Sequence, residues 1–270
     1  MTWTSDMTAL LAHGGDDFCQ AGHTSHATIR IDIDLNEHTV PDVPRSTGTF
    51  PINVYDWARY HGIPNYCPGN DELSLSIATQ GIWEGFETSL TQAILRTPGL
   101  VIDFGASAGW YTIIAAHAGC PVLAIEADTS NAHLLTSNLA LNDITHLVDV
   151  CHGWIGATTP PLTADQPVRL VKSDVEGAED HVMRVCGPLM AAGLIDYVLL
   201  EVSPILADHY PATLTAACAH GYDAFLIPEK GYPPDLFAAD PLTATLACPI
   251  QPCDVAGLRQ RSVLLARSAP

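Results

Sequence analysis

The sequence predicts an α/β fold in which a mostly parallel, seven-stranded sheet carries helices on both faces and follows an N-terminal extension. From residue 100 onward, short apolar runs typical of buried strands alternate with longer segments typical of helices. This alternation indicates parallel strands joined by crossover helices. The chain has 270 residues, of which 47% are hydrophobic and 15% are charged, so it can bury a full core.

Five apolar runs bounded by turn residues are expected to be the parallel strands of this sheet. They cover residues 100–104, 122–125, 147–151, 168–172 and 197–202. Two later runs, 222–227 and 262–266, are expected to close the sheet as antiparallel strands.

Helices are expected over residues 109–118, 131–141, 178–192 and 212–220. Apolar residues spaced by three or four positions predict one more helix over 74–95, before the break at Pro98 and Gly99. These elements together predict a main domain over residues 76–270.

Residues 1–75 are expected to form the N-terminal extension because their pattern is irregular. Residues 28–35 alternate apolar and polar side chains, which predicts a half-buried strand. Prolines then interrupt any long element, at Pro41, Pro44, Pro51, Pro64 and Pro68. We expect this extension to bind substrate or to form contacts in a homo-oligomer.

The charge balance restricts the partners of the protein. Eleven lysines and arginines face 30 acidic residues, which gives a formal net charge of −19. Because binding to phosphate backbones needs clustered basic residues, we expect no nucleic acid partner. Residues 104–125 lack charged side chains, but their glycines and Pro121 favour strands and turns over a membrane span. Residues 1–11 lack a basic, apolar leader, so we expect a soluble, cytoplasmic protein with no membrane partner.

The eight cysteines contain no C-x-x-C pair. In a cytoplasmic protein they are expected to be mostly reduced thiols. Whether Cys248 and Cys253 pair stays open.

The glycine turn that follows the first expected strand is the most informative segment of the chain. The strand runs into Gly105 and a helix follows Gly109, so the backbone between them can approach a ligand closely. Glu126 ends the next strand, about twenty residues after Gly105, where an acidic side chain accepts hydrogen bonds from both hydroxyls of a ribose. This spacing predicts a nucleoside cofactor.

S-adenosylmethionine suits this turn better than NAD does. The G-x-G-x-x-G pattern that binds a pyrophosphate is absent, since Ser107 occupies the second glycine position. A cationic sulfonium needs no pyrophosphate site and tolerates Asp103 beneath the turn. Trp154 follows the third strand, where its side chain either lies against the adenine ring or fills the core. The full set of expected cofactor contacts is Asp103, Gly105, Ala106, Ser107, Gly109, Glu126, Ala127, Asn131 and Trp154.

Three runs resemble the FkbM family of methyltransferases. They cover residues 101–118, A-I-E-A-D over 124–128 with Asn131, and V-K-S-D-V-E-G-A-E over 171–179, while G-I-W-E at 81–84 resembles a sequence that often precedes the family's domain. The resemblance spans about residues 80–205. It implies a Rossmann-like class I methyltransferase fold that uses S-adenosylmethionine, usually to methylate hydroxyls of sugars or secondary metabolites. The sequence departs from the family at Ser107, where Asn is frequent, and at Ala127, where Pro is frequent.

Lys172, Asp174 and Glu176 are the candidate catalytic residues because they follow the fourth strand, at the edge where α/β sheets bind ligands. Asp174 is expected to be the general base for an in-line methyl transfer, or to orient the acceptor hydroxyl. Lys172 either lowers the pKa of Asp174 or, if desolvated, serves as the base itself. The alternative for these acids is that they cap the next helix or favour its first turn, which is the role we expect for Glu179.

A metal site is the less favoured interpretation. Asp174 and Glu201, which follow neighbouring strands, offer oxygen ligands that suit Mg²⁺. Glu201 can equally pair with Lys172, so we expect no metal. His152 and His209 are further, lower-ranked candidates for the base.

The leading hypothesis is therefore an S-adenosylmethionine-dependent O-methyltransferase for a hydroxyl of a small molecule, such as a sugar or a glycosylated secondary metabolite. Two alternatives stay open. One is an NAD-dependent oxidoreductase on a Rossmann-like sheet, and the other is a catalytically inactive methyltransferase fold that serves as an interaction module.

Overall fold

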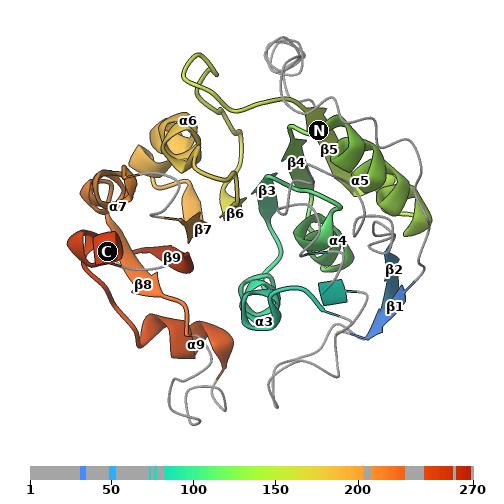
Figure 1. The fold of residues 1–270 in the computed structure, drawn as a ribbon, viewed down its shortest axis with the longest axis horizontal. Coiled ribbons are helices and arrows are strands. Elements are labelled where there is room, and N and C mark those ends of the chain that lie inside the picture. The colour runs from blue at the N-terminus through green and yellow to red at the C-terminus, as the bar shows by residue number, and fades with distance from the viewer. Residues whose placement is uncertain are drawn as a thin grey trace, which may run out of the picture.

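A seven-stranded sheet forms the centre of the protein (Figure 1). The computed structural model describes residues 31–34, 49–52, 73, 76–77, 82–203, 208–228, 240–257 and 260–268. The parallel strands are β3 (Leu100–Phe104), β4 (Val122–Glu126), β5 (Val148–His152), β6 (Val168–Ser173) and β7 (Ile195–Val202). The sheet is completed by β8 (Tyr222–Leu226) and β9 (Arg261–Arg267), and β9 runs antiparallel to both β7 and β8.

The strand order is β5-β4-β3-β6-β7-β9-β8. This order, with the reversed β9 between β7 and β8, is that of the Rossmann-like methyltransferase fold and confirms the predicted fold class. The connections that leave β3 and β6 lead to opposite faces of the sheet. Open α/β sheets bind ligands in the crevice that forms at such a point, beyond the carboxyl ends of the strands.

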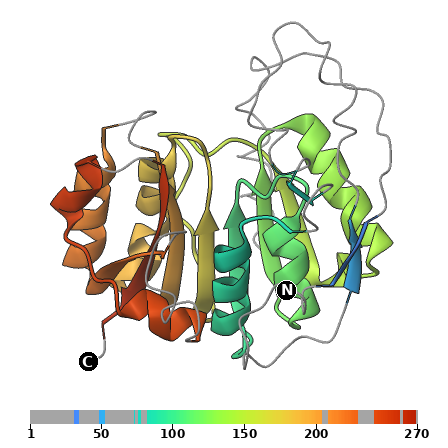
Figure 2. The same cartoon turned by 60° about the horizontal axis from the view of Figure 1, so that its bottom comes forward.

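Helices pack on both faces of the sheet (Figure 2). The apolar side chains of α3 (Gly85–Ile94), α4 (Trp110–His117) and α5 (Thr129–Leu141) join one core cluster, and those of α6 (Glu179–Ala191) and α7 (Tyr210–Ala219) join the other. The remaining short elements are η3 (Thr145–Leu147), α9 (Pro241–Leu246), which contacts α3, and η4 (Pro252–Gly257). Among the helices of the described residues, none is both long and apolar enough to cross a membrane.

The helix predicted over residues 74–95 is wrong as a continuous element. Leu73, Ser76 and Ile77 are helical, but α3 begins only at Gly85, after Glu84 adopts a left-handed φ of 42°. The break satisfies its own backbone, because the Thr88 hydroxyl donates to the carbonyl of Trp83. Periodicity does not reveal it, since the apolar side chains on both sides of the break still pack into one core cluster.

The strand predicted over residues 28–35 is confirmed as β1 (Ile31–Asp34). It pairs antiparallel with β2 (Thr49–Ile52), beside α5 (Figure 1). Ile52 is fully buried in the same core cluster as α4 and α5. The extension therefore packs against the main domain at this point, and its role in substrate binding or oligomerisation stays a prediction. Most of residues 1–75 lie outside the described residues.

The cysteines of the described residues are free thiols. Cys120, Cys151 and Cys186 are buried, whereas Cys253 is exposed. Cys248 and Cys253 do not form a disulfide.

Candidate active site

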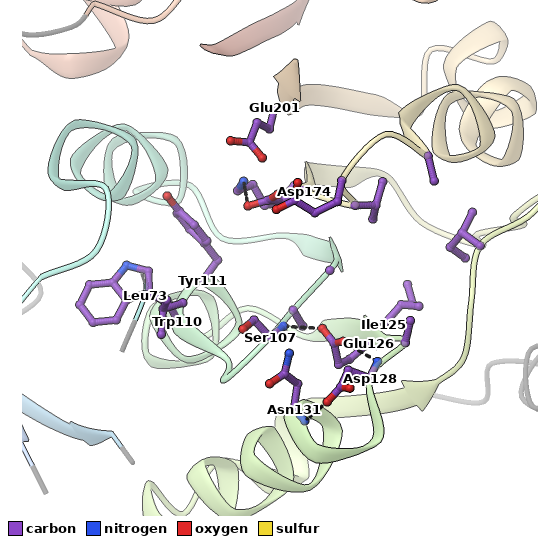
Figure 3. A pocket seen from close by; sticks show the side chains of 18 of the residues that line it. Leu73, Ser107, Trp110, Tyr111, Ile125, Glu126, Asp128, Asn131, Asp174 and Glu201 are labelled. Carbon is purple, nitrogen blue, oxygen red and sulfur yellow. Dashed lines mark hydrogen bonds and ion pairs between the residues drawn. The ribbon is translucent and has the colours of Figure 1, made fainter. Parts of the chain in front are cut away.

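A cavity of about 730 Å³ lies at the carboxyl ends of the central strands (Figure 3). Two groups of polar residues line it. One surrounds Glu126 at the end of β4, and the other surrounds Asp174, which follows β6. The apolar wall includes Ile125, Ile155 and Trp110.

The glycine turn joins these two groups. Gly105 has a φ of 77°, and a Cβ atom there would lie 1.8 Å from the carbonyl oxygen of Asp174. The turn therefore packs directly on the backbone that carries Asp174, and only glycine allows this approach. The backbone N–H of Gly105 also donates to the carbonyl of Ile125 at 2.9 Å, which ties the turn to β4.

Gly105→Ala is expected to destabilise the protein far more than Gly119→Ala. Both glycines have a positive φ, 77° and 79°, so both substitutions carry about 1–2 kcal/mol of left-handed backbone strain. A Cβ atom at Gly119 meets nothing within 4 Å, whereas one at Gly105 collides with the backbone. The difference should be about 2 kcal/mol or more in the free energy of unfolding, measured by urea denaturation. Equal losses in the two variants would contradict this packing.

Glu126 is anchored by the backbone around it. Its side chain is 6% exposed, and its two carboxylate oxygens accept the N–H groups of Ser107 and Asp128, each at 2.7 Å. Asp128 in turn accepts the N–H of Asn131 at 2.8 Å and caps α5. Burial raises the pKa of Glu126 to about 7, although the two backbone donors oppose this shift. Each oxygen retains acceptor capacity on the cavity wall, so a ligand with two neighbouring hydroxyls can bind there.

Most of the predicted cofactor contacts line the cavity. They are Gly105, Ala106, Ser107, Glu126, Ala127, Asn131 and Trp154. Trp154 is 50% exposed, so its ring is available to a ligand. Ser107 adopts a φ of 49°, which lets its N–H point at Glu126.

Asp103 and Gly109 were predicted to contact the cofactor, but neither residue lines the cavity. Asp103 is 2% exposed and accepts the hydroxyl of Thr112 at 2.6 Å, and burial raises its pKa to about 6. Gly109 precedes α4 and faces Leu135, whose side chain would lie 2.6 Å from a Cβ atom at this position. Both residues support the glycine turn through contacts outside the cavity, Asp103 with Thr112 and Gly109 with Leu135.

Lys172 and Asp174 lie in contact, because alternate residues of an extended chain point to the same side. The Lys172 ammonium lies 3.4 Å from the Asp174 carboxylate and 5.0 Å from the centre of the Tyr111 ring. Burial lowers the pKa of Lys172, but the neighbouring acids outweigh it and raise the pKa above its ordinary value. Lys172 is therefore charged and unsuited to act as a base. Although burial opposes ionisation of Asp174, Lys172 holds the pKa of this carboxyl below its ordinary range.

The acids after β6 have different surroundings. Asp174 does not cap α6, which follows Ala178 without a side-chain cap, and its side chain is 25% exposed to the cavity. Glu176, with a φ of 51°, is exposed and lies on the cavity wall. Glu179 belongs to the first turn of α6, as predicted, and is fully buried, where it accepts the hydroxyl of Tyr210 at 2.9 Å.

The residues predicted for the site leave out several polar residues of the cavity wall, among them Glu84 and Gln260. Glu84 accepts the hydroxyl of Tyr111 at 2.5 Å, and Gln260 donates its amide N–H to Glu201. The motif at residues 81–84 includes Glu84, but a continuous helix over residues 74–95 did not predict that the Glu84 side chain lines the cavity. No pattern in the sequence points to Gln260.

The two histidine candidates lie elsewhere. Among the residues that the structure places around the cavity, neither His152 nor His209 contributes to the wall. A ring nitrogen of His152 lies 3.1 Å from the carbonyl of Ala127. His209 lies beside Glu179, at 3.9 Å. Asp174 is therefore the better candidate for a base.

Comparisons with known proteins do not assign a family to this chain. No family model and no curated protein matches this sequence. The METTL16 methyltransferase domain aligns with a TM-score of 0.47 and 12% identity over 73% of this chain and 78% of its own. Precorrin-6y C5,15-methyltransferase from Geobacter metallireducens aligns with a TM-score of 0.46 and 14% identity over 74% and 96%. The O-methyltransferase TomG from Streptomyces achromogenes, solved with S-adenosylmethionine, aligns with a TM-score of 0.44 and 14% identity over 80% and 96%. Membership of the FkbM family therefore stays a prediction.

Proposed function

We propose that the protein is an S-adenosylmethionine-dependent O-methyltransferase of the FkbM type that acts on a hydroxyl of a small molecule, such as a sugar or a glycosylated metabolite. The observation that carries this proposal is the pairing of Glu126 and Asp174 in one cavity. The first is a buried carboxyl suited to ribose hydroxyls, and the second is a carboxylate held ionised by Lys172.

The cofactor end of the cavity fits S-adenosylmethionine. Glu126 offers both oxygens to the ribose, and Trp154 offers a ring face for the adenine. The glycine turn over residues 105–109 bears no basic side chain, and this suits a sulfonium better than a pyrophosphate. When bound, this cofactor supplies an electrophilic methyl group.

The acceptor end suits a neutral hydroxyl. Asp174 is exposed to the cavity, so it can accept the proton that the hydroxyl loses as its oxygen attacks the methyl carbon and the sulfur–carbon bond breaks. Glu84 and Glu201 add further acidic side chains at this end, which disfavours anionic acceptors. The formal net charge of −19 likewise disfavours nucleic acid as a substrate.

Calorimetric titration of the purified protein with S-adenosylhomocysteine, and separately with NAD, tests the cofactor. We expect micromolar binding of S-adenosylhomocysteine, about −8 kcal/mol, and no binding of NAD. Methyl transfer is then tested by incubating the protein with S-adenosylmethionine and a panel of sugars, and measuring the S-adenosylhomocysteine released. Binding of NAD alone would support the oxidoreductase instead. Binding of neither, by a folded protein, would favour the interaction module.

The affinity for S-adenosylhomocysteine is expected to depend on pH through Glu126. Burial raises the pKa of this carboxyl to about 7, and only the ionised form accepts both ribose hydroxyls. Affinity should therefore fall about tenfold as the pH falls from 8 to 6. Calorimetry at several pH values measures the change. An affinity that stays constant over this range would show that Glu126 is ionised throughout or does not contact the ribose.

A further inference from the structure

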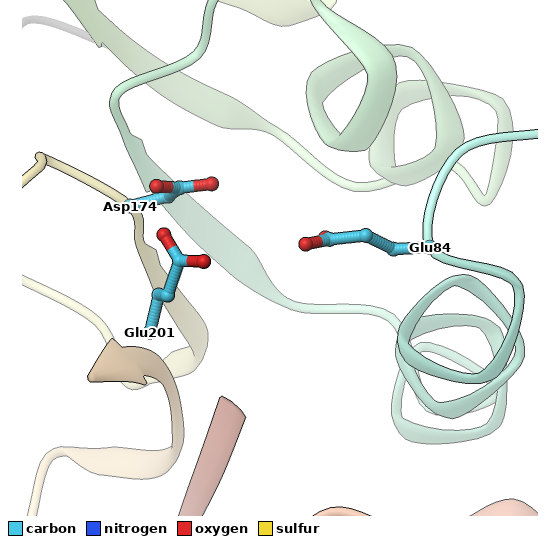
Figure 4. A group of neighbouring side chains, drawn as sticks. All are labelled: Glu84, Asp174 and Glu201. Carbon is cyan, nitrogen blue, oxygen red and sulfur yellow. The ribbon is translucent and has the colours of Figure 1, made fainter. Parts of the chain in front are cut away.

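Three carboxyl groups from three elements meet at the acceptor end of the cavity. Glu84 precedes α3, Asp174 follows β6, and Glu201 belongs to β7 (Figure 4). One carboxylate oxygen of each lies within 4.8 Å of the others. Like charges so close together in a largely buried site cannot all be ionised, and the single ammonium of Lys172 cannot neutralise three of them. At least one of these carboxyls therefore retains a proton near neutral pH.

The contacts around the cluster decide which carboxyl retains the proton. An oxygen of Asp174 and an oxygen of Glu201 lie within 4.8 Å of each other, so a proton on one of the two carboxyls relieves their repulsion and allows a hydrogen bond between them. Asp174 has the Lys172 ammonium at 3.4 Å, whereas the polar contact of Glu201 on its other side is the neutral amide of Gln260. The cation favours ionisation of Asp174, so of these two carboxyls Glu201 retains the proton.

We propose that Glu201 is a positioning residue that acts in its protonated form, donating its O–H to Asp174 and holding the Asp174 carboxylate toward the acceptor hydroxyl. This inference rests on the proposed function. The exposures support it, because the Asp174 side chain is 25% exposed, the Lys172 side chain is 3% exposed, and Glu201 as a whole residue is 8% exposed. Lys172 and Glu201 are therefore two largely buried groups beside a carboxylate that is itself exposed to the cavity.

The electrostatic surroundings of Glu201 agree with this arrangement. Burial, reinforced by the hydrogen bond with Asp174, raises the pKa of Glu201 to about 10. Among the described residues, the ionisable groups that face Glu201 are Lys172 from β6, Asp174 from the turn after it, Glu84 from the turn before α3, and Tyr210 from α7. On β9, Ser262 lies opposite Glu201, and Arg261 lies opposite Val202. A protonated Glu201 is a poor ligand for a divalent cation, so this proposal and a Mg²⁺ site at the same cluster exclude each other.

Glu201→Gln tests the protonation of Glu201 without any substrate, because an amide imitates a neutral acid. The pKa of Glu201 lies above its ordinary value of 4.5, so the folded state loses stability as the pH rises from there to about 10. The melting temperature of the wild type should therefore fall, between pH 6 and pH 9, by roughly 10 °C more than that of Glu201→Gln. Asp149→Asn removes one exposed acid of β5 and should keep the pH dependence of the wild type. Equal slopes for the wild type and Glu201→Gln, or failure of Glu201→Gln to fold at pH 7, would overturn the proposal.

Methyl transfer to a sugar that the wild type methylates tests the positioning role. Glu201→Gln still offers a donor to Asp174 and should keep kcat within about threefold, whereas Glu201→Leu should lose about a hundredfold in kcat. Both variants should bind S-adenosylhomocysteine as the wild type does. A hundredfold loss in Glu201→Gln, or a melting temperature that MgCl₂ raises in the wild type but not in this variant, would overturn the proposal.

If the wild type fails to bind S-adenosylhomocysteine, the proposed function fails, and the positioning role of Glu201 fails with it. Normal binding together with equal pH slopes removes only the present inference.

Discussion

Glu126→Ala is expected to abolish detectable binding of S-adenosylhomocysteine. The wild-type carboxylate is held by the N–H groups of Ser107 and Asp128 and presents its remaining acceptor capacity to the cavity. Hydrogen bonds to a charged acceptor contribute about 1.5–3 kcal/mol each. Loss of two such bonds from the ribose hydroxyls weakens binding by about a hundredfold or more. A micromolar complex would then lie beyond the range of calorimetry.

Asp149→Asn is the matched control for this experiment. It also removes one acidic charge, from β5 beside β4, but its side chain is exposed and does not line the cavity. Its affinity should equal that of the wild type. If Glu126→Ala binds S-adenosylhomocysteine within about threefold of the wild type, the ribose does not lie against Glu126 and the assignment of the cofactor end is wrong.

Asp174→Asn is expected to remove methyl transfer while leaving cofactor binding intact. The amide cannot accept the proton of the acceptor hydroxyl, and loss of a positioned base costs about 10²–10⁴-fold in rate. Asp174 lies at the acceptor end of the cavity and shares no hydrogen bond with Glu126 in the structure. Affinity for S-adenosylhomocysteine should therefore change by less than about twofold. The release of S-adenosylhomocysteine with the best sugar of the panel measures the rate.

The preserved affinity for S-adenosylhomocysteine also shows that Asp174→Asn is folded. A variant that keeps full activity would remove Asp174 from the catalytic residues, and Glu84 would become the next candidate because it lines the same end of the cavity. A variant that loses both activity and cofactor affinity would indicate that Asp174 supports the glycine turn, whose Gly105 packs on its carbonyl oxygen.

The sheet could be predicted from the sequence because its strands are locally distinct. Each of the runs that form β3, β4, β6 and β7 is short, apolar and bounded by turn residues, and burial on both faces demands that composition. The start of α3 could not be predicted in this way. Its boundary depends on the left-handed conformation of one residue, Glu84, while the apolar spacing continues across the break.

The candidate site shows the same contrast between features that the local sequence predicts and features that it does not. Ser107 and Glu126 could be predicted because the turn and the strand end are close in sequence and their spacing is characteristic. The pairing of Lys172 with Asp174 could be predicted because alternate residues of an extended chain share a side. The contacts of Glu201 with Gln260 and of Glu84 with Tyr111 join distant parts of the chain, and they follow from the packing of whole elements. Asp103 has the residue type of a ligand contact, yet only the structure shows that Thr112 binds it.

The reversed direction of β9 places a residue that is translated late, Gln260, at the acceptor end of the cavity. Because β9 runs against β7, its first residues lie where the parallel strands end, and Gln260 thereby reaches Glu201. The segment that carries Ser107 and Glu126 leaves the ribosome much earlier. A nascent chain of between 154 and 259 residues therefore contains the residues assigned to the cofactor end but lacks Gln260 of the acceptor end. The residues of the cofactor end are therefore all synthesised before the acceptor end is complete.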